Sequence, residues 1–239
     1  MSATRGKDAR AGATGAALLD LVAIMDRLRT ECPWDARQTH ESLAPYLIEE
    51  SYEALDALES GDRAALREEL GDVLLQVMFH ARVAAERSDG TGFTVDDVAD
   101  GIVTKLVRRH PHVFGSVTVA GADDVTRNWD AIKAAERAER ATGDRPASAL
   151  DGVPLGQPAL ALAAQLQGRA ERAGLPPDLA VPGGPDEGSR LGAELFELVA
   201  EARQAGLDPE LELRAAARRY GDLVRRWEQA QRGDQADTD

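Results

Sequence analysis

Helical spacing of apolar residues, almost without strand signals, is the feature that most limits how this chain can fold. β-Branched residues are scattered, and strong helix formers dominate. The chain is therefore predicted to be all-α, an antiparallel helix bundle, because Gly61-Asp62 leaves only a short connection between two long helices. We expect helices at about 15–30, 44–60, 62–87, 94–110 and 123–141.

Turn-forming stretches divide the chain into two helical regions. Gly, Pro and Asp are frequent between the regions and in the insert AGLPPDLAVPGGPDEG, and the first residues lack the apolar core of a signal peptide. The predicted parts are a flexible tail over 1–14, a first domain over 15–141, a linker over 142–158, a second helical region over 159–231 and a disordered tail over 232–239.

The two regions resemble each other weakly. GDVLLQVMFHAR in the first aligns with GAELFELVAEAR in the second, and the second copy has Ala193 and Arg190 where the first has Asp72 and Glu69. Packing residues are kept while charged residues are lost. This asymmetry suggests that the charges of the first copy do more than keep the protein in solution.

Charge and cysteine content exclude several classes of protein. Lys and Arg number 28 against 42 Asp and Glu, a net charge of −14, so we expect neither nucleic acid nor an anionic membrane as a partner. Cys32 is the single cysteine, which excludes an intrachain disulfide and a Cys-rich zinc site. The most apolar run, VLLQVMF, is too short to span a bilayer. A cytoplasmic protein is the default expectation.

Acidic residues crowd the second predicted helix in the segment LIEESYEALDAL. At about 100° per residue, Glu49, Glu50 and Glu53 share one side of the helix. Alone, such a pattern is usually a solvated helix face. The apolar residues form a stripe on the opposite side: Leu47, Ile48, Tyr52, Leu55 and Leu58.

The third predicted helix changes this interpretation. Its residues after Leu70 are apolar nearly all round, so we expect a central, buried helix on which Glu69, Asp72 and Gln76 form a narrow polar stripe. Carboxylates beside a buried stripe need a cation or a proton, because an unpaired buried charge is costly. Lysines are few and Arg67 points elsewhere on the helix.

Two facing helices would therefore gather Glu50, Glu53, Glu69 and Asp72 into a carboxylate cluster. Oxygen ligands without His or Cys suit Mg²⁺ or Mn²⁺, which also coordinate phosphate. A di-iron bundle would need Glu-x-x-His pairs, and the chain has none.

Two further pairs of residues suit a phosphate-bearing ligand. Lys105 and Arg109 lie four residues apart on the fourth helix, and Trp129 and Lys133 do so on the fifth. Each pair alone is more simply explained, as a cationic helix C-terminus or as a packed aromatic residue. Their order along the chain is what gives them weight.

With these residues in hand, the chain resembles the MazG family of nucleoside triphosphate pyrophosphohydrolases over about residues 15–140. The likeness runs through CPWDARQTHESLAPYLIEESYEALDAL, REELGDVLLQVMFHA, KLVRRHPHVFG and NWDAIKAAER. The signature E-E-x-x-E followed by E-x-x-D is met by Glu49, Glu50 and Glu53 and then by Glu69 and Asp72.

The resemblance implies a role for each matching residue. Glu50, Glu53, Glu69 and Asp72 would be metal ligands, with Glu49 assisting. Trp34 would line the pocket or simply anchor its loop, while His110 and His112 are read as structural. The nucleotide-side residues would be Lys105, Arg109, Trp129 and Lys133.

The implied reaction is Mg²⁺-dependent hydrolysis of a nucleoside triphosphate to the monophosphate and pyrophosphate, as nucleotide-pool house-cleaning. One of Glu49 and Glu50 would orient or deprotonate the water. The family also implies a homodimer that completes a four-helix core, and the second region lacks the signature and would be inactive. Two alternatives stay open: a non-catalytic dimerisation module, or a narrower hydrolase of dCTP, dUTP, oxidised nucleotides or guanosine tetraphosphate.

Overall fold

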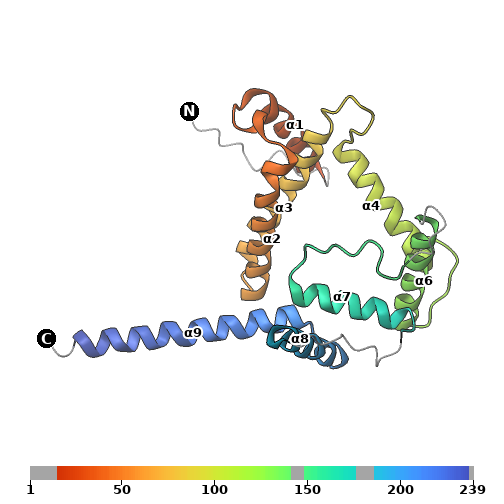
Figure 1. Cartoon of the computed structure of the whole chain (residues 1–239). Coiled ribbons are helices and arrows are strands. Elements are labelled where there is room, and N and C mark those ends of the chain that lie inside the picture. Colours follow the sequence, from red (N-terminus) through yellow and green to blue (C-terminus); the bar gives the residue numbers. More distant parts are fainter. Residues whose placement is uncertain (1–14, 141–147, 176–185, 237–239) are drawn as a thin grey trace. The chain divides into compact units, whose positions relative to one another are not determined.

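The structure is a computed structural model that describes residues 15–140, 148–175 and 186–236, with side chains left out at 137–140 and 233–236. Within these ranges all regular secondary structure is helical, which confirms the predicted all-α class (Figure 1). The elements are α1 (Ala16–Glu31), η2 (Asp35–Arg37), α2 (His40–Ser60), α3 (Arg63–Ala84), α4 (Val95–Arg109), α5 (Pro111–Phe114), α6 (Ala122–Arg140), α7 (Ala159–Arg172), α8 (Glu187–Gln204) and α9 (Pro209–Ala236).

The chain forms two compact units, Met1–Val125 and Thr126–Asp239, and each is described by itself. The predicted domain limits stay predictions. The expected tail over 1–14 and most of the expected insert lie outside the described residues, as do residues 142–147 of the expected linker. No described helix is both long and apolar enough to cross a membrane.

An antiparallel hairpin of α2 and α3 dominates the first unit. Thr39 starts α2 with a capping box, in which its hydroxyl accepts from the Ser42 amide at 3.3 Å and the Ser42 hydroxyl accepts from the Thr39 amide at 2.9 Å. Gly61 ends α2 at φ 75°, a left-handed conformation that favours glycine. Asp62 then caps α3 by accepting from the Ala64 and Ala65 amides. The short antiparallel connection predicted from Gly61-Asp62 is confirmed.

The core of the first unit lies at the end of this hairpin away from Gly61. Met25 of α1, Leu43 of α2 and Phe79 of α3 are buried together, and Leu75 and Val83 pack against them. Because the three come from three helices, this cluster fixes α1 on the hairpin.

Arg29 holds the η2 turn to the same core. Its side chain is only 9% exposed, pairs with Glu86 at 2.8 Å and donates to the backbone carbonyls of Gln38, at 3.0 Å, and Asp35. One arginine thus ties α1, the η2 turn and the end of α3 together.

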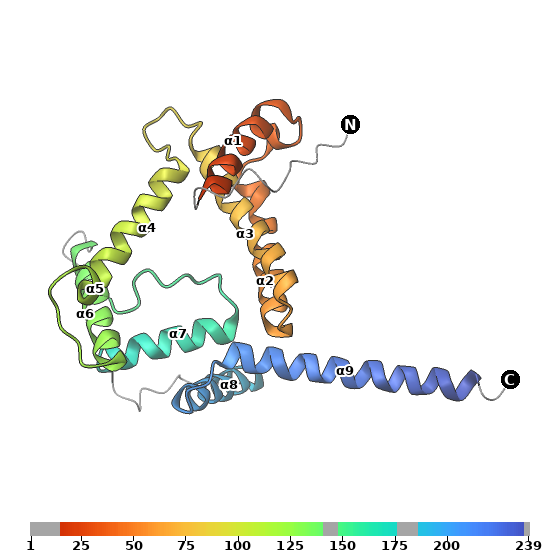
Figure 2. The same cartoon turned by 180° about the vertical axis from the view of Figure 1, so that it is seen from behind.

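Helix α4 leaves the hairpin at a turn. Thr94 caps it with Asp97 at the capping-box position, and Pro111 begins α5 one residue after it ends. Both views show α4 running away from the α2–α3 pair (Figures 1 and 2).

The hairpin leaves apolar surface open, which corrects the expectation of a buried third helix. On α2, Ile48 and Leu58 of the apolar stripe are 59% and 60% exposed. Helix α3 is not buried all round either: its buried residues are Gln76, Met78, Phe79, Ala81 and Ala84, whereas Leu70 and Val77 are exposed. The hairpin therefore buries a narrower face than its apolar content indicates.

The second unit contains α6 from Thr126 onward, followed by α7, α8 and α9. Helix α7 contacts both α8 and α9. Arg203 of α8 pairs with Glu171 of α7 at 2.6 Å, and Gln167 donates to the Phe196 carbonyl at 2.7 Å. Helix α9 continues to Ala236, past the residue where the predicted tail begins.

Candidate metal centre

Three carboxylates meet across the α2–α3 hairpin. Glu50 of α2 and Glu69 and Asp72 of α3 each offer an oxygen that lies within 4.8 Å of the other two, and all three side chains are half-buried. Glu69 and Asp72 share a helix face because they are three residues apart, and the antiparallel pairing brings Glu50 opposite them. The sequence predicted this convergence.

The carboxylates of the cluster are like charges held close together, and burial and these charges raise the pKa of two of them. Burial raises the pKa of Glu50, and the charges of Asp72, Glu53, Glu49 and Glu69 raise it further. Burial likewise raises the pKa of Glu69, followed by the charges of Glu53 and Asp72. Glu50 and Glu69 are therefore easier to protonate than a carboxyl group in water, because their raised pKa reflects the cost of holding the charge there.

No positive side chain of the described residues pairs with these carboxylates. Glu50, Glu69 and Asp72 take part in none of the ion pairs of the described chain. Two arginines close to the core of the first unit pair with other carboxylates, Arg29 with Glu86 and Arg82 with Asp26. The negative charge of the cluster is thus left for a ligand to balance.

The donor set fits a divalent cation. Neighbouring oxygens around octahedral Mg²⁺ are about 3 Å apart, and the three carboxylate oxygens lie within 4.8 Å of one another, so side-chain rotation would bring them to one ion. Carboxylate oxygens alone, without His or Cys, suit Mg²⁺ or Mn²⁺ rather than softer metals.

The other two predicted carboxylates lie beside this group rather than in it. Glu53 is exposed and close enough for its charge to act on both Glu50 and Glu69, whereas the charge of Glu49 acts on Glu50. Neither shares the group of three in which the ligand oxygens converge.

The predicted cationic and aromatic residues lie on other elements. Lys105 and Arg109 are on α4, which runs away from the hairpin (Figure 2). Trp129 and Lys133 are in the second unit, where the Lys133 ammonium lies 5.7 Å from the centre of the Trp129 ring. The predicted pairing of Trp129 with Lys133 is thus seen within its unit.

Trp34 packs at the core end of the hairpin. Its ring lies edge-on to Tyr46 at 6.1 Å and to Phe79 at 6.4 Å, yet 47% of the residue is exposed. This geometry suits a loop anchor and leaves an aromatic face open, so both interpretations of Trp34 stand. The His110 Nδ1 lies 2.7 Å from the Leu106 carbonyl oxygen, which fits a structural role at the end of α4.

Tyr46 and Gln76 lie next to the cluster, and the sequence argument gave them no role. Tyr46 is four residues before Glu50 on α2, and Gln76 is four residues after Asp72 on α3. Their helical spacing from the signature residues was the available signal.

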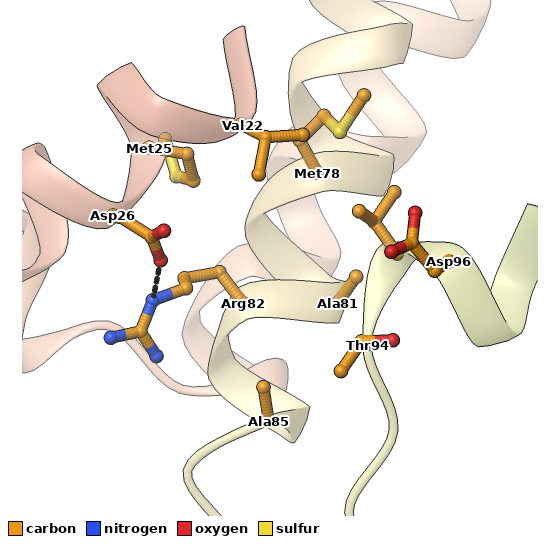
Figure 3. A pocket seen from close by; sticks show the side chains of 10 residues that line it. Val22, Met25, Asp26, Met78, Ala81, Arg82, Ala85, Thr94 and Asp96 are labelled. Atoms are coloured by element: carbon orange, nitrogen blue, oxygen red, sulfur yellow. Dashed lines mark ion pairs between the residues drawn. The ribbon is translucent and has the colours of Figure 1, made fainter. Parts of the chain in front are cut away.

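A pocket of about 240 Å³ lies elsewhere, between α1, α3 and the start of α4 (Figure 3). Met25, Met78 and Ala81 line it, and the Arg82–Asp26 ion pair, 2.6 Å long, stands at its side. None of the three clustered carboxylates lines this pocket. The volume therefore does not mark the metal centre.

Comparison with known proteins places the cluster in a family. Residues 38–114, which carry all the clustered carboxylates, match the family model of the MazG nucleotide pyrophosphohydrolase domain. A nucleoside triphosphate pyrophosphohydrolase/pyrophosphatase MazG from Thermotoga maritima is 37% identical over 230 residues, which cover 88% of this chain and 85% of that protein. The chain belongs to the MazG family.

This MazG protein is similar to further proteins. An "Uncharacterized 26.1 kDa protein in blaB 3'region" from Streptomyces cacaoi is 53% identical over 88% of this chain and 82% of its own length. A nucleoside triphosphate pyrophosphohydrolase of Mycolicibacterium smegmatis is 44% identical over 90% of this chain, which spans only 60% of that relative. A solved mazG-related protein from Thermotoga maritima has a TM-score of 0.43 and 27% identity, and covers 48% of this chain and 98% of that one. The predicted family is confirmed, and with it the assignment to a family of hydrolases.

Proposed function

We propose that this MazG protein hydrolyses nucleoside triphosphates to monophosphates and pyrophosphate with Mg²⁺, or Mn²⁺ in its place, at the α2–α3 hairpin. The observation that carries the proposal is the meeting of Glu50, Glu69 and Asp72 without a positive side chain among them. Three carboxylates by themselves repel a triphosphate, so a cation is needed between them and the substrate.

A divalent cation, when bound, neutralises phosphate oxygens and lowers the pKa of a coordinated water. In the proposed reaction Glu50, Glu69 and Asp72 hold the cation, and Glu53 adds negative charge beside them. Glu49 or Glu50 orients the attacking water and accepts its proton. The new bond would join the water oxygen to the α- or the β-phosphorus, and the P–O bond of the bridge between these two atoms would break, giving the monophosphate and pyrophosphate.

The remaining predicted residues contact parts of the substrate that the cation does not bind. Lys105, Arg109 and Lys133 bind phosphate oxygens and stabilise the leaving pyrophosphate. Trp129 and Trp34 offer aromatic surfaces to the nucleoside, which suits the open ring face of Trp34.

A homodimer and a cytoplasmic location belong to the same proposal. Ile48 and Leu58 expose apolar surface on α2, and surface of this kind on a helix hairpin is buried when a second copy completes a bundle. Mass measurement by light scattering tests this: a dimer is expected for the wild type, and a monomer for Ile48→Glu. A monomeric wild type would contradict the proposed dimer and would leave the proposed activity untouched.

Pyrophosphate release from a nucleotide panel tests the activity. The panel holds the common ribo- and deoxyribonucleoside triphosphates, an oxidised nucleotide and guanosine tetraphosphate, each with Mg²⁺ and with a chelator. We expect Mg²⁺-dependent release that Asp72→Asn and Glu53→Gln abolish while the helix content stays unchanged. Since Asp72 and Glu69 have no counterparts in the second region, no residual activity is expected from that region.

Glu68→Gln is the matched control, because Glu68 is exposed and lies outside the group of three. It should keep the wild-type rate. Release from one nucleotide alone would narrow the substrate. If no nucleotide releases pyrophosphate, a non-catalytic interaction module explains the chain better. Unchanged turnover in Asp72→Asn would contradict the assignment of the metal site to the α2–α3 hairpin.

A further inference from the structure

Gln76 is a buried polar side chain that the proposed reaction does not use. It is 5% exposed, and its amide oxygen is fully buried and has no hydrogen-bond partner in the structure. Buried polar atoms nearly always have a partner, and leaving one unpaired costs stability. An unpaired amide in the middle of a helix interface therefore needs an explanation.

The contacts of the hairpin fix where Gln76 lies. Leu43 and Phe79 share the core cluster, while Glu50 and Asp72 meet in the carboxylate cluster. Gln76 is three residues before Phe79 and four after Asp72 on α3. It therefore occupies the layer of the hairpin between the core and the metal centre.

Tyr46 occupies the same layer on α2. It is three residues after Leu43 and four before Glu50, so the antiparallel register sets it opposite Gln76. The Trp34 ring stands edge-on to Tyr46, and both aromatic residues are partly exposed. One helical turn from the carboxylates, the hairpin thus holds one buried amide in the same layer as two partly exposed aromatic rings.

The opposite side of the cluster has no such groups. Towards Gly61 the inward residues are Ala57, which is buried, and Leu66, which is half-buried. A nucleotide with its phosphates at the carboxylates would meet aromatic and amide groups in one direction only. Nucleobases and sugars have flat apolar faces and hydrogen-bonding edges, which match this combination.

We infer that Gln76 hydrogen-bonds the nucleoside part of the substrate and sets how strongly the enzyme distinguishes a nucleotide from a bare polyphosphate. This inference rests on the proposed function. A neutral amide cannot replace a carboxylate as a charge partner for the cation, but it offers one acceptor and two donors to a base or a sugar hydroxyl. A site built around such a bond rejects a ligand that lacks the matching group.

If Gln76 binds the nucleoside, replacing it with an apolar residue should weaken nucleotide binding without lowering the stability of the free protein. Leucine fills nearly the same volume as glutamine and removes the unpaired oxygen, so Gln76→Leu should leave the melting temperature of the free protein unchanged or higher. A glutamine kept only for structure would behave differently, since its loss would lower the melting temperature and leave ligand preference unaltered.

The test compares a nucleoside triphosphate with inorganic tripolyphosphate, both with Mg²⁺, by calorimetry and by competition during turnover. For Gln76→Leu we expect the nucleotide Kd and KM to rise at least about tenfold, the loss of one good hydrogen bond. The dissociation constant of tripolyphosphate should stay within about twofold of the wild-type value. Gln76→Met serves as a second apolar variant should leucine pack poorly.

Gln167→Leu is the matched control. Gln167 of α7 also has a buried amide oxygen without a partner, but its Nε2 donates to the Phe196 carbonyl. Its replacement should lower the melting temperature and leave the ratio of nucleotide to tripolyphosphate affinity unchanged.

Three outcomes would overturn the inference. Equal weakening of nucleotide and tripolyphosphate, or no change in either, would remove Gln76 from nucleoside recognition while the wild-type activity stands. The same shift in Gln167→Leu would show that the effect is not local. A wild type that binds no nucleotide at all would remove the inference together with the proposed function.

Discussion

Glu50 and Asp72, on two different helices, place carboxylate oxygens within 4.8 Å of each other. Burial raises the pKa of Glu50, and Asp72 is the neighbouring charge that raises it most. Without a ligand this arrangement destabilises the hairpin, because two like charges are held close together in a partly buried place. A bound cation reverses the sign of the interaction.

Removal of one of these charges should therefore have opposite effects with and without metal. We expect Glu50→Gln to raise the melting temperature of the metal-free protein and to weaken Mg²⁺ binding at least about tenfold. Thermal unfolding over a series of Mg²⁺ concentrations measures both effects. Wild-type stabilisation by Mg²⁺ in this variant would contradict the ligand role of Glu50.

The pair of His40 and His80 should make stability depend on pH. Their Nδ1 atoms lie 2.8 Å apart with the rings stacked, and burial, with the charge of His40 as the smaller cause, lowers the pKa of His80. His40 is also the first residue of α2, where the helix dipole disfavours a positive charge.

The direction of this dependence follows from proton linkage. Unfolded His80 titrates near 6.5 and folded His80 at lower pH, so the unfolded state binds more protons in between. The contribution of neutral His80 to the free energy of unfolding is fully present above pH 6.5. It decreases as the pH falls towards the lower pKa of the folded state. Urea unfolding from pH 7.5 to 5.5 should show a smaller fall for His80→Gln, and an equal slope in both proteins would rule the pair out.

Arg29 and Arg27 give a matched comparison of a buried and an exposed ion pair on α1. Arg29→Ala removes the side-chain donor to the Gln38 and Asp35 carbonyls and one of the two arginines that pair with Glu86, so we expect a loss of about 3 kcal/mol in the free energy of unfolding. Arg27 pairs with Glu31 at the surface with 75% of its side chain exposed, and Arg27→Ala should cost less than about 0.5 kcal/mol. Urea denaturation measures both, and equal losses would contradict the anchoring role of Arg29.

Lys133 carries the expected contribution of the second unit to substrate binding. Lys133→Gln should lower kcat/KM by at least about tenfold, mostly through KM, because a charge-assisted bond to a phosphate oxygen is lost. Arg225→Gln is the control in the same unit, since Arg225 pairs with Asp222 on the surface and has no proposed contact with substrate. Steady-state kinetics with wild-type KM for Lys133→Gln would contradict the assignment.

Local signals in the sequence predicted most helices of the first unit and the meeting of the carboxylates. Thr94 with Asp97, and Gly61 with Asp62, define helix ends through short-range hydrogen bonds and backbone preference, so sequence alone locates them. The spacing of Glu69 and Asp72 fixes a shared face in the same way.

Features that depend on long-range packing could not be predicted from the sequence. Arg29 joins partners that are distant in the chain, and no spacing rule links it to Glu86 or to the η2 turn. Helix α3 was expected to be buried all round, but apolar content shows only which residues could be covered and not what covers them. Gln76 stood out on a polar stripe, yet its unpaired oxygen became visible only with the packed hairpin.

Metal location by anomalous scattering tests the central claim most directly. In crystals of the protein grown with Mn²⁺, we expect an anomalous peak about 2.2 Å from carboxylate oxygens of Glu50, Glu69 and Asp72, and no such peak for Asp72→Asn. A wild-type map with no peak between these residues, in an enzyme that still releases pyrophosphate with Mn²⁺, would contradict the account.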